Sequence, residues 1–276
     1  GTLVDDEFCE EMRRVGNLSL SISLEGFEEV NDMRRGEGVF DKVMAAMDRL
    51  KKYGLIFGTS ICYTRKNIET VTSDEFLDMI IGKGCRFTWY FHYMPVGNDA
   101  APDLLPTKEQ REYMYHRVRE IRGATGGKPI YAMDFQNDGE FVGGCIAGGR
   151  NYCHINANGD VEPCVFIHYS SANIREVTLL EALKQPLFMA YRDRQPFNSN
   201  HLRPCPMLEN PEILQEMIKE TGAKSTDLQS PESAEHLCSK CKAYACEWKK
   251  TADQLWKEHP HQQKGYTNYK KRVEKQ

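Results

Sequence analysis

The second half of the chain contains cysteines whose spacing suits metal binding. Cys145, Cys153 and Cys164 fall within twenty residues. Asn158-Gly159 between them is typical of a two-residue hairpin turn, because both residues tolerate the positive φ of a type I′ turn. Closing this hairpin would bring Cys153 and Cys164 toward one end, with Cys145 just upstream. We therefore interpret the stretch as one half of a metal site.

Cysteines far along the chain would supply the other half. Cys205 stands between two prolines, Cys238 and Cys241 form a CxxC motif, and Cys246 follows it. A CxxC places two thiolates on one tight turn and is typical of zinc and iron-sulfur sites. The chain has ten cysteines and no export signal, so we expect metal-binding thiols rather than disulfides. The isolated cysteines are interpreted as small apolar core residues: Cys9, Cys62 and Cys85.

Length and composition exclude several classes of protein. A chain of 276 residues can bury a sizeable core in one or two domains. The net charge of -4 gives no attraction to nucleic acid or anionic lipid. No apolar run approaches the roughly 20 residues that a membrane helix needs, and the start has no signal sequence. We expect a soluble, cytoplasmic protein without nucleic-acid or membrane partners.

Strand and helix patterns alternate in the first half, which must position any functional groups there. Strands are expected over residues 18–24, 55–63, 86–94 and 129–133. Helices are expected from Asp5 or Asp6 to Gly16, over 38–52, after the capping box Thr72-x-x-Glu75, and from Thr107-x-x-Gln110 to about residue 122. This alternation favours βαβ units in a parallel sheet, whose functional groups gather at the carboxyl ends of the strands.

The pattern changes after residue 142 to hairpin, loop and cysteine. Short helices are expected over 179–183 and 187–191, a clearer one over 210–221, a polar loop over 222–233 and a helical tail from Cys246 onward. We therefore predict an α/β unit over residues 1–142, a small cysteine-rich α+β domain over 143–250 and a helical tail over 251–276.

Three stretches resemble a known family. They are the opening GTLVDDEFCEEM, the run SISLEG followed by NDMRRGEGVFDKVMAAMDRLKKYG, and the spacing Cys145-x13-Gly159-x4-Cys164. Together they resemble the radical S-adenosylmethionine (radical SAM) enzymes that carry a C-terminal SPASM-type auxiliary cluster domain. The resemblance spans nearly the whole chain, and the cysteine spacing is its most specific part. It implies a partial (β/α) barrel, the C-terminal half of a radical SAM barrel, followed by a SPASM-like domain.

The sequence departs from this family at two places. The family's CxxxCxxC motif, which binds the cluster that cleaves S-adenosylmethionine, occurs nowhere in the chain. We therefore expect that the first barrel strands are missing and that the chain cannot start the radical reaction alone. The spacing of Cys238, Cys241 and Cys246 also differs from the usual SPASM tail. Two auxiliary clusters would need eight thiolates and the second domain has seven, so we expect one [4Fe-4S] cluster and leave a second open.

The resemblance also implies site residues. The auxiliary cluster ligands would come from Cys145, Cys164, Cys205, Cys238 and Cys241, with Cys153 and Cys246 as further candidates; the alternative is that these are buried free thiols. S-adenosylmethionine in the intact enzyme would contact Ser23, Glu25, Arg35, Met94 and Pro95. A solvated strand face and a solvated arginine are the alternatives for Ser23 and Arg35.

The function implied is a radical SAM oxidoreductase that modifies a peptide or protein by hydrogen abstraction through a deoxyadenosyl radical. An electron donor such as flavodoxin or ferredoxin would be a partner, and the auxiliary cluster would bind substrate or carry an electron. The competing hypothesis is a non-catalytic zinc-binding interaction module, with Cys145, Cys164, Cys238 and Cys241 in a closed tetrahedral site.

Overall fold

The computed structural model describes residues 1–123 and 127–258 and divides the chain into two compact units. Of the helical tail predicted over 251–276, residues 251–258 belong to a helix and residues 259–276 lie outside the described residues. We call residues 1–93 and 103–135 the first unit, and residues 94–102 together with the chain from 136 onward the second unit. No helix within the described ranges is both long enough and apolar enough to cross a membrane.

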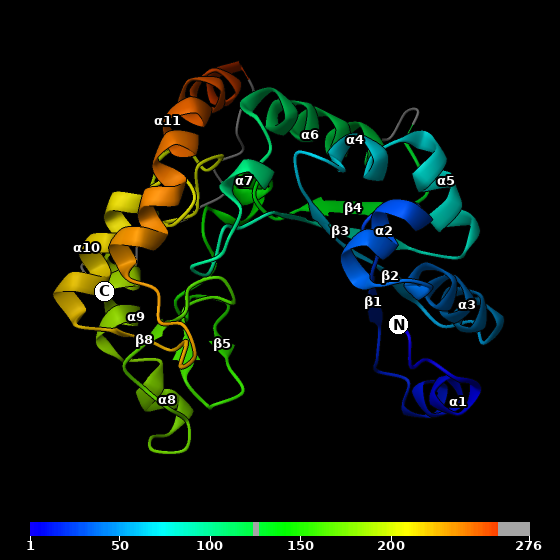
Figure 1. Cartoon of the computed structure of the whole chain (residues 1–276), viewed down its shortest axis with the longest axis horizontal. Helices are drawn as coiled ribbons and strands as arrows, with labels where there is room; N and C mark the ends of the chain where they lie inside the picture. Colours follow the sequence, from blue (N-terminus) through cyan, green and yellow to red (C-terminus); the bar gives the residue numbers. More distant parts are fainter. Residues whose placement is uncertain (124–126, 259–276) are drawn as a thin grey trace, which may run out of the picture. The chain divides into compact units, whose positions relative to one another are not determined.

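The first unit is built on a parallel sheet, as the alternation of strands and helices predicts. Within the described residues its strands, in spatial order, are β1 (Leu20–Ser23), β2 (Phe57–Tyr63), β3 (Phe87–His92) and β4 (Tyr131–Asp134) (Figure 1). Each strand begins later than predicted. Leu18 and Ile56 remain 52% and 63% exposed before their strands begin, so their apolar character does not reflect burial in the sheet.

Helices connect these strands and cover one face of the sheet. They are α1 (Asp6–Val15), α2 (Glu28–Arg35), α3 (Val39–Lys52), α4 (Ile68–Val71), α5 (Asp74–Gly82) and α6 (Lys108–Ile121). The capping box that opens α6 is present, with Thr107 and Gln110 bonded reciprocally. The box predicted at Thr72 is wrong. Ser73 caps α5 instead. The Thr72 hydroxyl is not available as a cap, because it donates to the carbonyl of Ile68, the first residue of α4.

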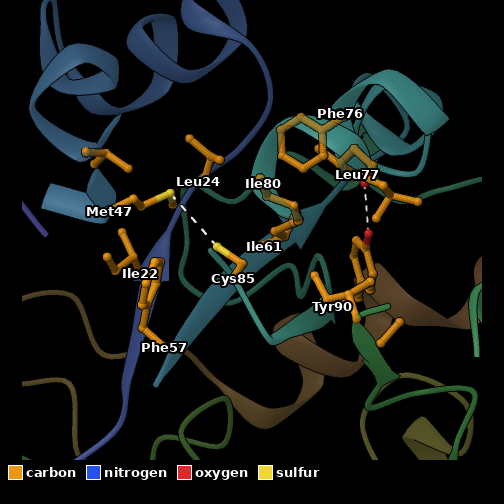
Figure 2. Packing of buried hydrophobic residues seen from close by; sticks show 14 of the residues in the cluster. Ile22, Leu24, Met47, Phe57, Ile61, Phe76, Leu77, Ile80, Cys85 and Tyr90 are labelled. Atoms are coloured by element: carbon orange, nitrogen blue, oxygen red, sulfur yellow. Dashed lines mark hydrogen bonds between the residues drawn. The ribbon is translucent and has the colours of Figure 1, made fainter. Parts of the chain in front are cut away.

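The hydrophobic core lies between the sheet and these helices. Figure 2 shows strand residues such as Ile22 and Ile61 packed against Met47, Phe76 and Ile80 of the helices. Alternate strand residues therefore enter the core, as the period of two predicts. The interpretation of Cys9 and Cys85 as core residues agrees with their burial at 0% and 1% exposure.

The opposite face of the sheet carries side chains of another kind. Ser21 and Ser23 on β1 are only partly buried, and β3 contributes alternate aromatic residues. Phe91 stacks on Phe135 with ring centroids 4.4 Å apart. Gly58 on β2 makes room for this aromatic row, since a Cβ there would lie 2.2 Å from the Phe87 carbonyl oxygen. One half of this face is thus polar and the other aromatic.

The second unit has short elements joined by turns. They are α7 (Gly139–Val142), β5 (His154–Ile155), β6 (Val161–Glu162), β7 (Tyr169–Ser170), α8 (Leu179–Ala182), α9 (Pro186–Arg194), α10 (Pro211–Thr221), β8 (Lys224–Ser225) and α11 (Ala234–Glu258) (Figure 1). The strands pair antiparallel, β5 with β6 and β7 with β8. The region over 222–233, expected as a polar loop, thus contains β8, and α11 begins twelve residues before Cys246.

The predicted hairpin forms, but its turn differs from the prediction. His154 pairs with Glu162 across β5 and β6. The connection is not a type I′ turn, since among the described residues only glycines have positive φ. The Asn156 side chain instead accepts hydrogen bonds from the amides of Asn158 and Asp160, at 2.9 and 3.0 Å. This Asx-type closure makes a positive φ at Asn158 unnecessary.

Candidate functional site

Three cysteines of the second unit influence one another electrostatically. Cys145, Cys164 and Cys205 are each partly buried. Burial raises the pKa of Cys164 to about 12, and the charge of a Cys145 thiolate raises it further. The pKa of Cys205 is raised well above its usual value by burial, by the Glu209 carboxylate and by both other cysteines. The three cysteines are therefore close enough for the charge of one to affect the pKa of another.

Backbone amides lie near these sulfurs. The Leu208 amide donates to Cys205 Sγ at 3.4 Å. The Ala147 amide lowers the pKa of Cys145 and the Phe166 amide lowers the pKa of Cys164, each against the larger effect of burial. Hydrogen bonds to the charged form of a group favour that form. The backbone is thus arranged to accept thiolates, which are the form that binds metals.

Local turns explain why amides lie near these sulfurs. Cys164 and Ile167 form an antiparallel bridge, with the Ile167 amide 3.0 Å from the Cys164 carbonyl. At Cys205 the Glu209 carboxylate accepts from the Cys205 amide at 2.7 Å and the Glu209 amide donates back to the Cys205 carbonyl at 3.2 Å. Both cysteines therefore sit at the start of tight turns whose later amides are directed toward the side chain.

The remaining candidate ligands are placed differently. Cys238 and Cys241 lie one turn apart on α11 and are fully buried, so the motif is helical and not the tight turn expected. Burial raises the pKa of Cys241 to about 12, with further contributions from Cys238 and Glu209. Cys153 packs against an apolar cluster that includes Val161, and Cys246 is exposed.

Beyond the larger effect of burial, the charge of Glu209, whose carboxylate accepts from the Cys205 amide, raises the pKa of Cys145, Cys205 and Cys241. Among residues 1–123 and 127–258, no three histidine, cysteine or acidic side chains converge as a single-ion metal site. The donor set nonetheless fits a thiolate-bound group, since deep thiols with amides directed at sulfur are the environment that iron-sulfur clusters use. Sequence reasoning missed Glu209, whose spacing of four residues from Cys205 was the available signal.

A second group of polar residues lies at the carboxyl end of β1 in the first unit. Glu25 is 1% exposed. Arg35 Nε donates to Glu25 Oε1 at 3.2 Å, and Arg34 Nη1 lies 2.9 Å from Glu25 Oε2. The Cys62 amide donates to Glu25 Oε2 at 3.2 Å. One buried carboxylate therefore holds two arginines, and their guanidinium groups carry one more positive charge than Glu25 neutralises.

This group changes the interpretation of two predicted residues. Cys62 is not an inert core residue: it is partly buried, and the positive charge of Arg34 partly offsets the raised pKa that burial causes. Arg35 binds a carboxylate of the chain itself. Ser23 pairs through the strand backbone with Ser60. Arg34 was missed, because the sequence offers two adjacent arginines without a signal for which of them turns inward.

Met94 and Pro95 follow β3 but belong to the second unit. The Gln136 amide nitrogen lies 4.0 Å from Met94 Sδ. Farther along the same segment, the Gly97 amide donates to Glu232 Oε2 at 2.9 Å. The segment that leaves the third strand is therefore held by side chains of the second unit.

Comparison with known proteins supplies the family context. Residues 145–207 match the SPASM model, described as an iron-sulfur cluster-binding domain. The AdoMet-dependent heme synthase of Methanosarcina barkeri is 25% identical over 198 residues, which cover 64% of this chain and 56% of that protein. The mycofactocin maturase MftC of Mycolicibacterium smegmatis is 30% identical over 173 residues, which cover 60% of this chain and 43% of that protein.

Solved structures share the fold. The chain matches anSMEcpe with bound AdoMet and Cp18Cys peptide at a TM-score of 0.54 and 14% identity, covering 94% of this chain and 74% of that one. It matches SuiB of Streptococcus suis bound to S-adenosylmethionine at a TM-score of 0.53 and 17% identity, covering 74% and 52%.

The chain spans about half the length of the two curated relatives described above. The α/β fold with a cysteine-rich second part, expected from the sequence, is confirmed by these solved structures, and the expected iron-sulfur domain by the SPASM match over residues 145–207. Residues 145–207 therefore match a SPASM-type iron-sulfur cluster-binding domain, and about 60% of the chain is similar to radical S-adenosylmethionine enzymes.

Proposed function

We propose that the second unit binds one [4Fe-4S] cluster through Cys145, Cys164, Cys205 and Cys241, and that the chain is part of a radical SAM oxidoreductase. The observation that supports the proposal is that these thiols are buried beside backbone amides, with the Leu208 amide donating to Cys205 Sγ at 3.4 Å. When bound, the cluster supplies a centre for electron transfer or for binding substrate. Cys238, one helical turn from Cys241, is the alternative fourth ligand.

Burial disfavours the charged form of these thiols, and a bound metal would offset this. Without one, the desolvation that raises the pKa of Cys145 to about 11 keeps the group protonated at neutral pH. Coordination to a cation removes this penalty, and the amide donors then stabilise the thiolate that remains. Cys153 and Cys246 stay outside this ligand set, because their surroundings are an apolar cluster and solvent.

We further propose that the carboxyl end of β1 takes part in binding S-adenosylmethionine in the intact enzyme. The excess positive charge of Arg34 and Arg35 over Glu25 suits the carboxylate of its amino-acid part. Glu25 holds the two guanidinium groups in place, and Ser23 offers a hydroxyl on the same strand. Met94 and Pro95 remain predictions from the family resemblance.

The substrate we propose is a peptide or a protein side chain. In support, one relative is a mycofactocin maturase and one solved relative contains a bound peptide. Other relatives are heme synthases, so the choice between substrates requires the activity of the full-length enzyme. An electron donor of the flavodoxin or ferredoxin class is the proposed partner.

Anaerobic reconstitution with iron and sulfide tests the cluster. We expect about four irons with matching sulfide per chain and broad visible absorption, both lost in Cys164→Ala. Cys85→Ala is the matched control, since burial also raises the pKa of that thiol to about 12 but Met47 is its sulfur contact. Comparing Cys241→Ala with Cys238→Ala identifies the fourth ligand. One zinc per chain without visible absorption would instead establish the zinc-binding module.

A further inference from the structure

One buried hydroxyl group near the candidate cluster ligands has no hydrogen bond. Tyr191 on α9 is fully buried, and its hydroxyl oxygen has no partner among the residues that the structure describes. Leaving a buried polar group unbonded costs about 1–3 kcal/mol, so such groups in native proteins call for a specific explanation. A phenylalanine at this position would fill the same space without that cost.

The ring of Tyr191 is held where the loops of two ligands meet. The Gly148 amide donates to the Pro163 carbonyl at 3.0 Å, which ties the loop after Cys145 to the residue before Cys164. Gly148 has φ +68°, and a Cβ there would come within 2.5 Å of the Tyr191 ring. The ring therefore lies directly on the backbone that joins the two cysteine loops.

A second aromatic residue restricts the ring from another side. Phe197 meets Tyr191 edge to face, with ring centroids 5.2 Å apart and an interplanar angle of 90°. Between Gly148 and Phe197 the ring cannot turn away without repacking. The hydroxyl is thus fixed in place.

The unbonded hydroxyl lies among the candidate ligands of the second unit. Burial raises the pKa of Tyr191 well above its usual value, and the charges of Cys145, Cys164, Cys205 and Cys238 raise it further. Because it has no acceptor among the described residues, the hydroxyl is available as a donor toward sulfur. The other buried tyrosine hydroxyls differ: that of Tyr90, for example, donates to the Val71 carbonyl at 2.8 Å.

We propose that the Tyr191 hydroxyl donates a hydrogen bond to a sulfur atom of the cluster held by Cys145, Cys164 and Cys205, and thereby raises the reduction potential of that cluster. The inference rests on the proposed cluster function. A hydrogen bond to sulfur stabilises the more negative, reduced state more than the oxidised state, which is how surrounding donors tune cluster potentials.

The test compares Tyr191→Phe with the wild-type chain after reconstitution. We expect both to bind the same amount of iron, and the reduction equilibrium of the variant to shift about tenfold toward the oxidised state, which is 59 mV for a one-electron couple. The potential is measured by redox titration of the visible and electron paramagnetic resonance signals. Tyr90→Phe removes a buried hydroxyl of the first unit and should leave the potential unchanged.

The metal-free variant provides a second readout. Tyr191→Phe removes an unbonded hydroxyl, so thermal unfolding of the metal-free chain should occur at the same or a higher temperature. Failure of this variant to fold would mean that the hydroxyl has a structural partner, which overturns the inference. An unchanged potential in an iron-loaded variant also overturns it while leaving the proposed function intact, whereas absence of iron from the wild type overturns both.

Discussion

Two buried thiols, one from each unit, have the same raised pKa for the same main reason. Burial raises the pKa of Cys85 in the first unit and of Cys164 in the second to about 12. Their sulfurs nevertheless have different neighbours. Cys85 contacts the thioether of Met47 at 4.0 Å (Figure 2), whereas the backbone amide of Phe166 lies near Cys164 and lowers its pKa against the effect of burial. The donors around the sulfur, more than its burial, distinguish a metal ligand from a core residue.

The two units also differ in where their glycines with positive φ lie. In the first unit the glycines with positive φ are spread along the chain, at 16, 26, 36, 38, 54 and 84. In the second unit the stretch around Cys145 turns through glycines with positive φ at 143, 144, 148 and 149. Glycine adopts this conformation without steric penalty. The ligand region thus depends on individual turns and the sheet region on periodicity.

Gly148→Ala should have the largest effect among substitutions that test this contrast. The positive φ costs about 1–2 kcal/mol, and the clash at 2.5 Å with the Tyr191 ring adds about 1–3 kcal/mol by overpacking. We expect a loss of about 2–5 kcal/mol in the unfolding free energy, measured by urea denaturation, together with a lower iron content after reconstitution.

Gly222→Ala is the matched control for that substitution. Gly222 has φ +65° but no atom within 4 Å of an added Cβ, so only the backbone penalty of about 1–2 kcal/mol applies. Equal losses of unfolding free energy in the two variants would show that the contact with Tyr191 contributes nothing. The turn at Gly148, near the cysteines, would then not differ from the turn at Gly222.

Acid should selectively destabilise the first unit through His92. Burial, followed by the charge of Arg111, lowers the pKa of His92 to about 3. The unfolded chain binds a proton near pH 6.5 and the folded chain does not, so the contribution is complete above pH 6.5 and is lost as the pH falls toward 3. The slope from this group is about 1.4 kcal/mol per pH unit.

Urea denaturation of the wild type and of His92→Gln between pH 7 and pH 4 measures this contribution. The difference between the two isolates His92 from other titrating groups. We expect a shallower loss of stability with acid in the variant. Parallel curves would mean that the buried imidazole is protonated in the folded chain.

The smallest effect should come from two equivalent helix caps. Thr107 opens α6 in the first unit and Thr178 opens α8 in the second, each in a reciprocal capping box. Replacing either with alanine should cost about 1 kcal/mol, measured by thermal unfolding. Because α8 has a single turn, Thr178→Ala should also lower its local protection in hydrogen exchange, while Thr107→Ala leaves α6 protected. Equal loss of protection would contradict this difference.

Sequence periodicity predicts much of the first unit because buried side chains recur at regular spacing along its strands and helices. Apolar residues at every second position of β1 and at helical spacing in α3 indicate both the elements and the face they bury. The same helical spacing occurs in α11, where Leu237, Cys241, Tyr244 and Trp248 are buried. The CxxC motif by itself indicates a tight turn, and that interpretation is wrong because the motif lies within this helix.

The ligand surroundings were harder to predict because they depend on contacts between distant segments. β8 exists through its pairing with β7, and each contributes only two residues, too few for a periodic pattern. Likewise, the spacing of Cys145 and Cys164 indicates ligands, but which amides face their sulfurs depends on turns that the sequence does not specify. Arg34 and Tyr191 carry no sequence signal of their roles.

The tryptophan positions give the two units separate optical reporters. Of the three tryptophans, Trp89 lies on β3 in the first unit, and Trp248 and Trp256 lie on α11. Trp248 is fully buried, with its indole nitrogen donating to the Leu202 carbonyl at 2.9 Å. Replacing Trp89 with phenylalanine would leave fluorescence emission from the second unit alone, so that cluster loading could be followed as quenching of light from the helix that carries Cys241.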